Sequence, residues 1–316
     1  MNSTCKILFV SVLILQDGTM NRKEYFLKEL ELHHKSIDKI HPYGRSCKYV
    51  ITDHYTAQIF KFHNYDRSFE LYISELGGHS FYDSRKSMID GCPLPRMLLF
   101  GEFLQNLRYS LNIVLIDTDT LVIKNLETMF IKYSDFDIGF TLSFRARNKQ
   151  KDTYLNVGAI YIHGGNNIQG AANLLQRISN LCVDDKKIID GAVILDQFST
   201  FFALEKYCMS RKCDIFQKSK GDCILVKVPA LETEATRVLL LGDEFNTVAT
   251  KLYRGSHVVH FTGNRKSLMK NRAKYFLENG EKKLLSALHI RAVFRREKTQ
   301  MQIGANSKSL SWMGIL

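Results

Sequence analysis

Short, unbroken runs of apolar residues alternate with amphipathic segments over the first part of the chain. Residues 7–15 (ILFVSVLIL) form such a run, and residues 21–37 repeat their apolar side chains at helical spacing. Parallel strands that are covered on both faces have continuous runs of Val, Ile and Leu, because every side chain is buried. The pattern therefore predicts a buried strand followed by an amphipathic helix.

The same alternation continues further along the chain. We interpret residues 48–53, 69–76 and 112–117 as strands, and residues 95–108 as a helix with a proline near its first turn. Strands that alternate with helices in this way indicate an α/β fold with a mostly parallel central sheet flanked by helices. In such sheets ligands bind beyond the carboxyl ends of the strands, so the last of these strands should deliver its final side chains to a ligand site.

The second half of the chain mixes strand and helix patterns without a marked linker. No internal repeat or low-complexity tract divides it. We therefore expect one domain over residues 1–270 and a basic helical extension over residues 271–316, packed on the domain or trailing from it. The expected strands are residues 137–144, 157–163 and 223–229, and the expected helices are residues 171–183, 194–207 and 269–288.

The first apolar run has an alternative interpretation. Lys6 precedes it, so it resembles the apolar region of a short signal peptide. The run is too short to cross a bilayer as a helix, and no A-x-A cleavage pattern follows it. We favour the strand.

The seven cysteines are scattered along the chain and odd in number. This usage is typical of a reducing compartment, and it leaves one or two disulfides open. The predicted location is the cytoplasm, with peripheral contact to a membrane as an option and the lumen of the secretory pathway as the less favoured alternative.

The chain of 316 residues carries a formal net charge of +12, and its excess of Lys and Arg is densest after residue 264. Nucleic acid, an anionic membrane surface or a phosphorylated ligand would each fit such a charge. The sequence has neither zinc-finger spacing nor the aromatic signature of RNA-binding domains. We favour a phosphate-bearing ligand together with an anionic surface over nucleic acid. Residues 283–296 fit either an interfacial membrane helix or a solvated helix packed on the domain.

Asp117 and Asp119 stand one residue apart at the end of an apolar strand, so their carboxylates can converge on one cation. Hard oxygen ligands suit Mg²⁺ or Mn²⁺, which can bind the phosphates of a ligand at the same time. Such an ion neutralises negative charge on a nucleoside-diphosphate leaving group. The plainer interpretation is a solvated turn. A second D-x-D pair, Asp135 and Asp137, precedes its strand, so we expect it to face solvent and give it no role.

The same letters also fit the nucleophile motif of haloacid-dehalogenase-type phosphatases. Asp117 would then be the nucleophile and Asp119 the general acid and base. That motif normally follows the first strand of its fold and has Gly-Thr after its second aspartate, whereas Thr120 follows here after three earlier strands. The phosphatase remains an alternative, as does a basic nucleic-acid or membrane-binding module.

Further short motifs follow the aspartates in a fixed order. They are Leu155-Asn156-Val157-Gly158, Asp196-Gln197 and His260-Phe261-Thr262-Gly263-Asn264-Arg265-Lys266, and Arg96 stands at a helix start before the aspartates. In this order they resemble the D-x-D, F-N-x-G, D-Q and H-F-x-G-x-x-K motifs of retaining glycosyltransferases of the family-eight type, the group of glycogenin and bacterial galactosyltransferases. The resemblance spans about residues 5–270 and lies in order and spacing.

The resemblance implies the GT-A fold and a metal-dependent transfer of a sugar from a nucleoside-diphosphate sugar, in particular a UDP-sugar, to an acceptor hydroxyl with retention of configuration. Asp117, Asp119 and His260 would bind the metal, and the imidazole favours Mn²⁺ over Mg²⁺. The acceptor, whether glycan, protein or lipid, is not implied. The donor-binding residues implied are Arg96, Asn156, Gly158, Gly263 and Lys266, with Gly263 and Lys266 at the diphosphate, and the catalytic residues implied are Asp196 and Gln197.

Some of these residues also have structural interpretations. His260 could be a core histidine, and Asp196 could be the N-cap of the helix that follows it. The sequence also departs from the family pattern. Ser267 and Leu268 replace the Pro-Trp that normally follows the lysine, and Trp312 is the only tryptophan. These departures indicate a divergent or neighbouring GT-A group.

Overall fold

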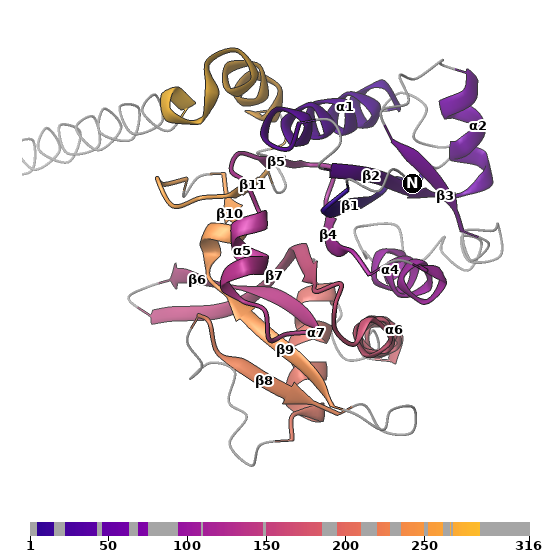
Figure 1. Ribbon diagram of the computed structural model, residues 1–316, viewed down its shortest axis with the longest axis vertical. Helices are drawn as coiled ribbons and strands as arrows, with labels where there is room; N and C mark the ends of the chain where they lie inside the picture. The colour runs from indigo at the N-terminus through magenta and orange to yellow at the C-terminus, as the bar shows by residue number, and fades with distance from the viewer. Residues whose placement is uncertain are drawn as a thin grey trace, which may run out of the picture.

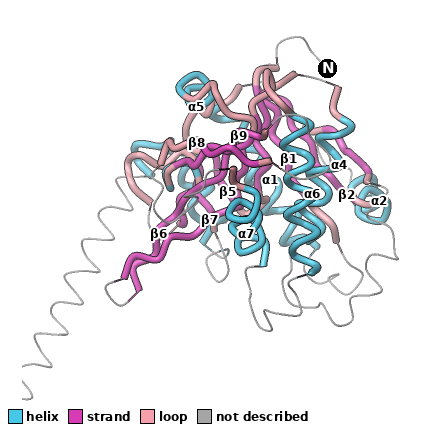
Figure 2. The backbone as a smooth tube through the Cα atoms, turned by 90° about the horizontal axis from the view of Figure 1, so that it is seen from below, coloured by secondary structure: helices cyan, strands magenta, loops and turns pink. Residues whose placement is uncertain are grey.

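The computed structural model of the protein describes residues 5–15, 23–42, 46–62, 69–74, 94–108, 110–147, 150–184, 195–209, 220–227, 235–249, 252–261, 266 and 268–284. The fold is a layered α/β arrangement in which helices pack on both sides of a large sheet (Figures 1 and 2). This confirms the α/β fold that the alternation of apolar runs predicted.

The large sheet has eight strands in the order β3-β2-β1-β4-β7-β6-β9-β8. Four of its seven neighbouring pairs are parallel, and the other three are antiparallel. Each antiparallel pair includes a strand that follows β4 in the chain, and the very short connection between β6 and β7 allows only a hairpin. The strands are β3 (Glu70–Ile73), β2 (Ser46–Thr52), β1 (Ile7–Val12), β4 (Asn112–Ile116), β7 (Gln150–Ile162), β6 (Ile138–Arg147), β9 (Thr236–Leu241) and β8 (Cys223–Val226).

Each face of this sheet has its own apolar core. On one face the strands pack against α4 (Leu94–Asn106), α6 (Ile168–Asp184) and α7 (Leu195–Tyr207). On the other face they pack against α1 (Lys23–Ile40), α2 (His54–Phe62) and α5 (Glu127–Lys132). Coverage of both faces explains why β1 and β4 are apolar at nearly every position.

A second, smaller sheet lies at the carboxyl end of β4. Its order is β10 (Thr247–Val248), β11 (Val258–His260) and β5 (Thr120–Val122). The 3₁₀ helix η5 (Asp243–Phe245) precedes β10. In the antiparallel pair of β11 and β5, His260 lies opposite Thr120. The small sheet therefore brings the end of the described domain back to the turn that leaves β4.

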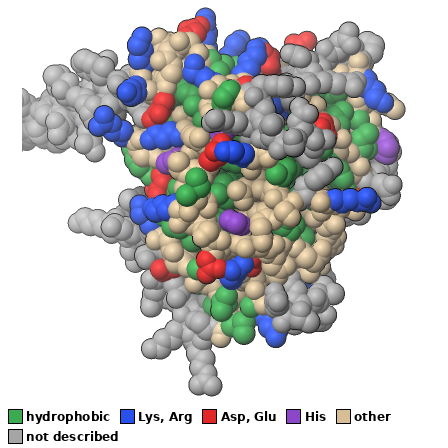
Figure 3. Space-filling view, viewed as in Figure 1, with side chains coloured by type: hydrophobic (Ala, Val, Ile, Leu, Met, Phe, Trp, Pro, Cys, Tyr) green, Lys and Arg blue, Asp and Glu red, His purple; other side chains and the backbone are tan. Residues whose placement is uncertain are grey.

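A C-terminal helix over residues 268–284 packs on the small sheet. Its buried side chains, Met269, Ala273, Phe276 and Leu284, join one core with Leu121, Val259 and Phe261. Lysines gather on its outer side, at the upper left of Figure 3, and four of them are exposed: Lys270, Lys274, Lys282 and Lys283. Within the described part of the chain, no helix is both long and apolar enough to cross a membrane. The boundary predicted at residue 270 remains a prediction, and most of residues 283–296 lie outside the described residues.

Every strand and helix expected before residue 117 is present within a few residues of its predicted bounds. Those expected later are present as β6, β7, β8, α6, α7 and the C-terminal helix. The sequence did not predict α2, α5, β5 or β9 to β11. Most of these elements are too short to show a readable period of apolar residues.

The second D-x-D pair differs from the prediction. Asp137 is 1% exposed and does not face solvent. Its carboxylate accepts hydrogen bonds from the backbone N–H and the guanidinium of Arg237, at 2.6 and 2.8 Å, and so ties β9 to the start of β6. Asp135 faces solvent as predicted, with 84% of its side chain exposed.

Cys5 and Cys47 form a disulfide that links the start of β1 to β2. Cys208 is disulfide-bonded as well, so disulfides, which the sequence left open, are present. Cys223 is a free, exposed thiol.

Candidate functional site

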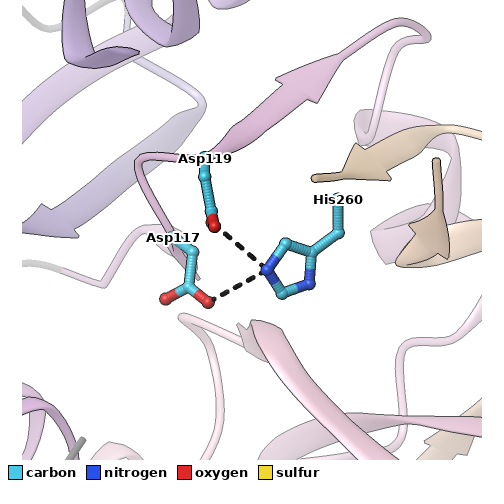
Figure 4. Close-up of side chains that lie close together, drawn as sticks. All are labelled: Asp117, Asp119 and His260. Atoms are coloured by element: carbon cyan, nitrogen blue, oxygen red, sulfur yellow. Dashed lines mark ion pairs between the residues drawn. The ribbon is translucent and has the colours of Figure 1, made fainter. Parts of the chain in front are cut away.

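Asp117 and Asp119 lie in a tight turn that joins the end of β4 to the start of β5. The amide of Asp117 donates to the carbonyl of Gly158 on β7 at 2.9 Å. The hydroxyl of Thr120 donates to the carbonyl of Asp117 at 2.7 Å. Because both ends of the turn are held by hydrogen bonds, the two carboxylates have fixed positions on the same side of it (Figure 4).

The imidazole of His260, at the end of β11, faces both carboxylates. Its Nε2 lies 3.4 Å from Oδ2 of Asp117 and 3.2 Å from Oδ1 of Asp119. The amide of the next residue, Phe261, donates to the carbonyl of Asp119 at 2.9 Å. Among the described residues, these three form the only cluster of His, Cys, Asp and Glu that could hold a metal ion, with ligand atoms within 4.8 Å of one another.

Two cationic side chains hold the remaining carboxylate oxygens. The guanidinium of Arg96, from the first turns of α4, pairs with Oδ1 of Asp117. The ammonium of Lys266 lies 3.0 Å from Oδ2 of Asp119. Each aspartate thus directs one oxygen to a cation of the protein and the other toward His260.

The inward-facing atoms fit Mn²⁺ or Mg²⁺. Two carboxylate oxygens and one imidazole nitrogen form a donor set that suits Mn²⁺ in particular. The backbone beside them also leaves room, because Gly158 carries no side chain. A Cβ at that position would lie 2.3 Å from Cε1 of His260 and 3.1 Å from Oδ2 of Asp117. The site thus requires glycine at this point of β7.

Neighbouring charges and burial shift the pKa values of this cluster in opposite directions. Burial alone would raise the pKa of Asp119, but His260 and Lys266 outweigh it and hold that pKa below its usual value. Burial alone would lower the pKa of His260, but the carboxylates of Asp119 and Asp117 raise it. The pKa of Lys266 is raised in the same way, chiefly by Asp119. Asp119 thus lies beside two basic side chains of the protein, His260 and Lys266.

Asn156 lies two residues before Gly158 on β7 and is buried. Its side-chain oxygen accepts from the amide of Gly158 at 3.2 Å, and its NH₂ donates to the carbonyl of Asn246 at 3.2 Å. Asn246 donates in return to the carbonyl of Asn156 at 3.2 Å. This amide pair fixes the backbone of β7 beside His260.

The other predicted residues are described only in part. Gly263 and the side chain of Asp196 lie outside the described residues. Gln197 is half-buried on α7. Their expected roles at the donor sugar and the diphosphate remain predictions.

Several residues at this site had no role in the sequence analysis. They include Thr120, Asn246 and His33, which contacts Thr120 from α1. For His33, the sequence offers one signal: two adjacent histidines, His33 and His34, lie on the apolar side of an amphipathic helix. For Asn246 no local pattern marks its contact with Asn156.

No family model matches the sequence, and no curated protein matches it. Solved structures do resemble the fold. The glycosyltransferase GlyE of Streptococcus pneumoniae TIGR4 aligns with a TM-score of 0.50 at 11% identity, over 91% of this chain and 64% of the GlyE chain. The galactosyltransferase LgtC, in complex with donor and acceptor sugar analogues, aligns with a TM-score of 0.50 at 12% identity, over 86% of this chain and 96% of the LgtC chain.

The chain therefore spans less than two thirds of the length of GlyE but nearly all of LgtC. At these identities the likeness establishes the fold, which is the GT-A fold predicted from the sequence. The activity has to be argued from the site.

Proposed function

We propose that the protein is a glycosyltransferase that moves a sugar from a nucleoside-diphosphate sugar to an acceptor hydroxyl, with Mn²⁺ or Mg²⁺ held by Asp117, Asp119 and His260. One observation carries this proposal. Two carboxylates and an imidazole converge beyond the carboxyl end of β4, with a lysine and an arginine beside them. The GT-A fold supports it, because LgtC binds donor and acceptor sugar analogues on the same fold.

The residues around the cation would each contact a different part of the donor, either its diphosphate or its sugar. A bound divalent ion neutralises the negative charge that develops on the departing diphosphate. Lys266 would supply a second positive charge there, and the backbone at Gly263 would supply N–H donors, as the resemblance implies. Arg96, which pairs with Asp117, would contact the donor sugar, as Asp196 and Gln197 would from α7. The donor that we propose is a UDP-sugar, and we propose transfer with retention because these residues resemble the motifs of retaining glycosyltransferases.

Replacement of Asp119 tests the proposal. Asp119→Ala removes one of the inward-facing oxygens and the partner of Lys266. We expect a loss of about a hundredfold or more in Mn²⁺-dependent hydrolysis or transfer of a UDP-sugar, because fixed charge at a leaving group typically contributes that much. The measurement is release of UDP with and without Mn²⁺.

The chain offers a matched control in Asp135, an exposed aspartate of the second D-x-D pair. Asp135→Ala should leave the rate unchanged. Full activity of Asp119→Ala would disprove the proposed metal site. A thermal-shift screen of UDP-, GDP- and CMP-sugars, each with and without Mn²⁺, then identifies the nucleotide. We expect the largest shift for a UDP-sugar together with Mn²⁺.

The phosphatase interpretation makes different predictions. It requires hydrolysis of simple aryl phosphates and a phosphoryl-aspartate at Asp117. Asp117 follows β4, the fourth strand in chain order, whereas the phosphatase motif follows the first. A nucleic-acid-binding module would instead show salt-dependent binding of nucleic acid and no binding of nucleotide sugars.

A further inference from the structure

His33 is a fully buried histidine on α1 that contacts the backbone beside the proposed cation site. Its Nδ1 lies 3.0 Å from the carbonyl oxygen of Thr120 and 3.1 Å from the hydroxyl oxygen of the same residue. On the other side of the ring, Nε2 lies 3.3 Å from the hydroxyl of Ser11 on β1. The imidazole therefore bridges β1 to the first residue of β5.

These contacts define which nitrogen carries the proton. A carbonyl oxygen only accepts, so Nδ1 must be the N–H that donates to Thr120. Nε2 then accepts from the hydroxyl of Ser11. Burial lowers the pKa of His33 to about 4, so the ring is neutral at physiological pH and this arrangement is the stable one.

Thr120 is connected to all three proposed ligands. Its hydroxyl donates to the carbonyl of Asp117 at 2.7 Å. Its backbone follows Asp119 directly and pairs with His260 across the small sheet. A shift of Thr120 would thus move both carboxylates relative to the imidazole of His260.

We infer that His33 is a positioning residue of the proposed cation site. Its Nδ1–H donates to Thr120 and thereby holds the turn with Asp117 and Asp119 in place. The inference rests on the proposed function, since it concerns the same cation. Groups behind metal ligands commonly orient those ligands and contribute roughly ten- to a hundredfold to metal affinity. His33 would do so from a separate helix, through the backbone of the turn rather than through a ligand side chain.

Two isosteric substitutions separate this role from simple core packing. In His33→Asn the side-chain NH₂ can take the place of Nδ1–H, whereas in His33→Gln it takes the place of Nε2 and the donor to Thr120 is lost. We expect Mn²⁺ binding in the presence of UDP, measured by titration calorimetry, to weaken by about tenfold or more in His33→Gln. In His33→Asn it should stay close to that of the unaltered protein.

His34 provides the matched control. It is buried on the same helix, but its ring packs on Phe69 at 4.9 Å instead of on the turn. His34→Asn should lower the melting temperature without changing the affinity for Mn²⁺. Equal losses of affinity in His33→Gln, His33→Asn and His34→Asn would overturn the inference, because core packing would then explain them all.

Amide hydrogen exchange of the protein without metal completes the test. His33→Gln, but not His33→Asn, should speed exchange in peptides covering residues 117–121. If His33→Gln does not fold, Ser11→Ala, which removes the donor to Nε2, should speed the same exchange. Unchanged exchange in the variant that folds would overturn the inference. If the unaltered protein binds no Mn²⁺ while exchange changes as expected, the proposed function fails but the contact between His33 and the turn stands.

Discussion

At the scale of single residues, the site depends on close contacts between backbone and side chains. Gly158 shows this most directly, because the imidazole of His260 lies against its Cα. Two of the proposed ligands come from the turn between β4 and β5 and the third comes from β11, and neighbouring residues that would not bind the cation set their geometry. Small changes at these neighbours should thus alter cation binding as well as stability.

Gly158→Ala is a direct prediction. The added Cβ would lie 2.3 and 2.4 Å from two ring atoms of His260, closer than any stable contact, so the imidazole must move. We expect cation-dependent activity to fall by about tenfold or more, and stability to fall by about 1–3 kcal/mol. Titration with Mn²⁺ and urea unfolding measure the two effects.

Gly165→Ala is the control for that substitution. A Cβ at Gly165 would meet only His163, at an ordinary distance of 3.6 Å. Its activity and stability should match those of the unaltered protein. Normal Mn²⁺ affinity in Gly158→Ala would show that the ion does not bind at His260.

Much of the candidate site could be predicted from the sequence, because the residues next to the two aspartates mark their place in the fold. Asp117 and Asp119 follow an apolar strand, and a strand end of this kind locates a ligand site in an α/β sheet. His33 and Asn246 could not be predicted in the same way, because their partners lie far away in the chain. We expected Asp137 to face solvent for a related reason. The arginine that pairs with it lies on β9, far along the chain, so no local pattern showed the contact.

At the scale of elements, the long strands and helices were readable and the short ones were not. β1 and β4 are covered on both faces, so their apolar runs are unbroken. β5 and β11 have three residues each, too few to show a period, yet they carry the turn and His260. Two of the elements that form the site were therefore among the hardest to predict.

The C-terminal helix supports these two short strands. Phe276 is fully buried against residues of β5 and β11, whereas the neighbouring Tyr275 is 37% exposed. We expect Phe276→Ala to lower the free energy of unfolding by about 3–5 kcal/mol, because it leaves a cavity in this core. Tyr275→Ala on the same helix should change it by less than about 1 kcal/mol. Urea unfolding of both variants is the measurement, and equal effects would contradict the packing described here.

At the scale of the whole molecule, buried histidines couple stability to pH. Burial lowers the pKa of His33 and of His41 to about 4, and it lowers that of His34 well below its usual value. Unfolded histidines have a pKa of about 6.5, so between these values the unfolded chain binds more protons than the folded one. Stability should therefore fall as pH drops from about 6.5 to about 4, by roughly 3 kcal/mol for His33 alone.

Urea unfolding at pH 7 and pH 4.5 measures this dependence. His33→Asn cannot take up the proton, so it should lose less stability on acidification than the unaltered protein. The same pH dependence in both proteins would show that His33 does not contribute.

The pairing of β5 with β11 also determines when the site can exist during synthesis. The turn with both aspartates emerges from the ribosome long before His260 and the strand that carries it. A nascent chain that has already formed the parallel half of the large sheet still lacks the third ligand and the partner of β5. The proposed site therefore matures after most of the scaffold, and cation binding would mark a chain that has completed nearly all of its described fold.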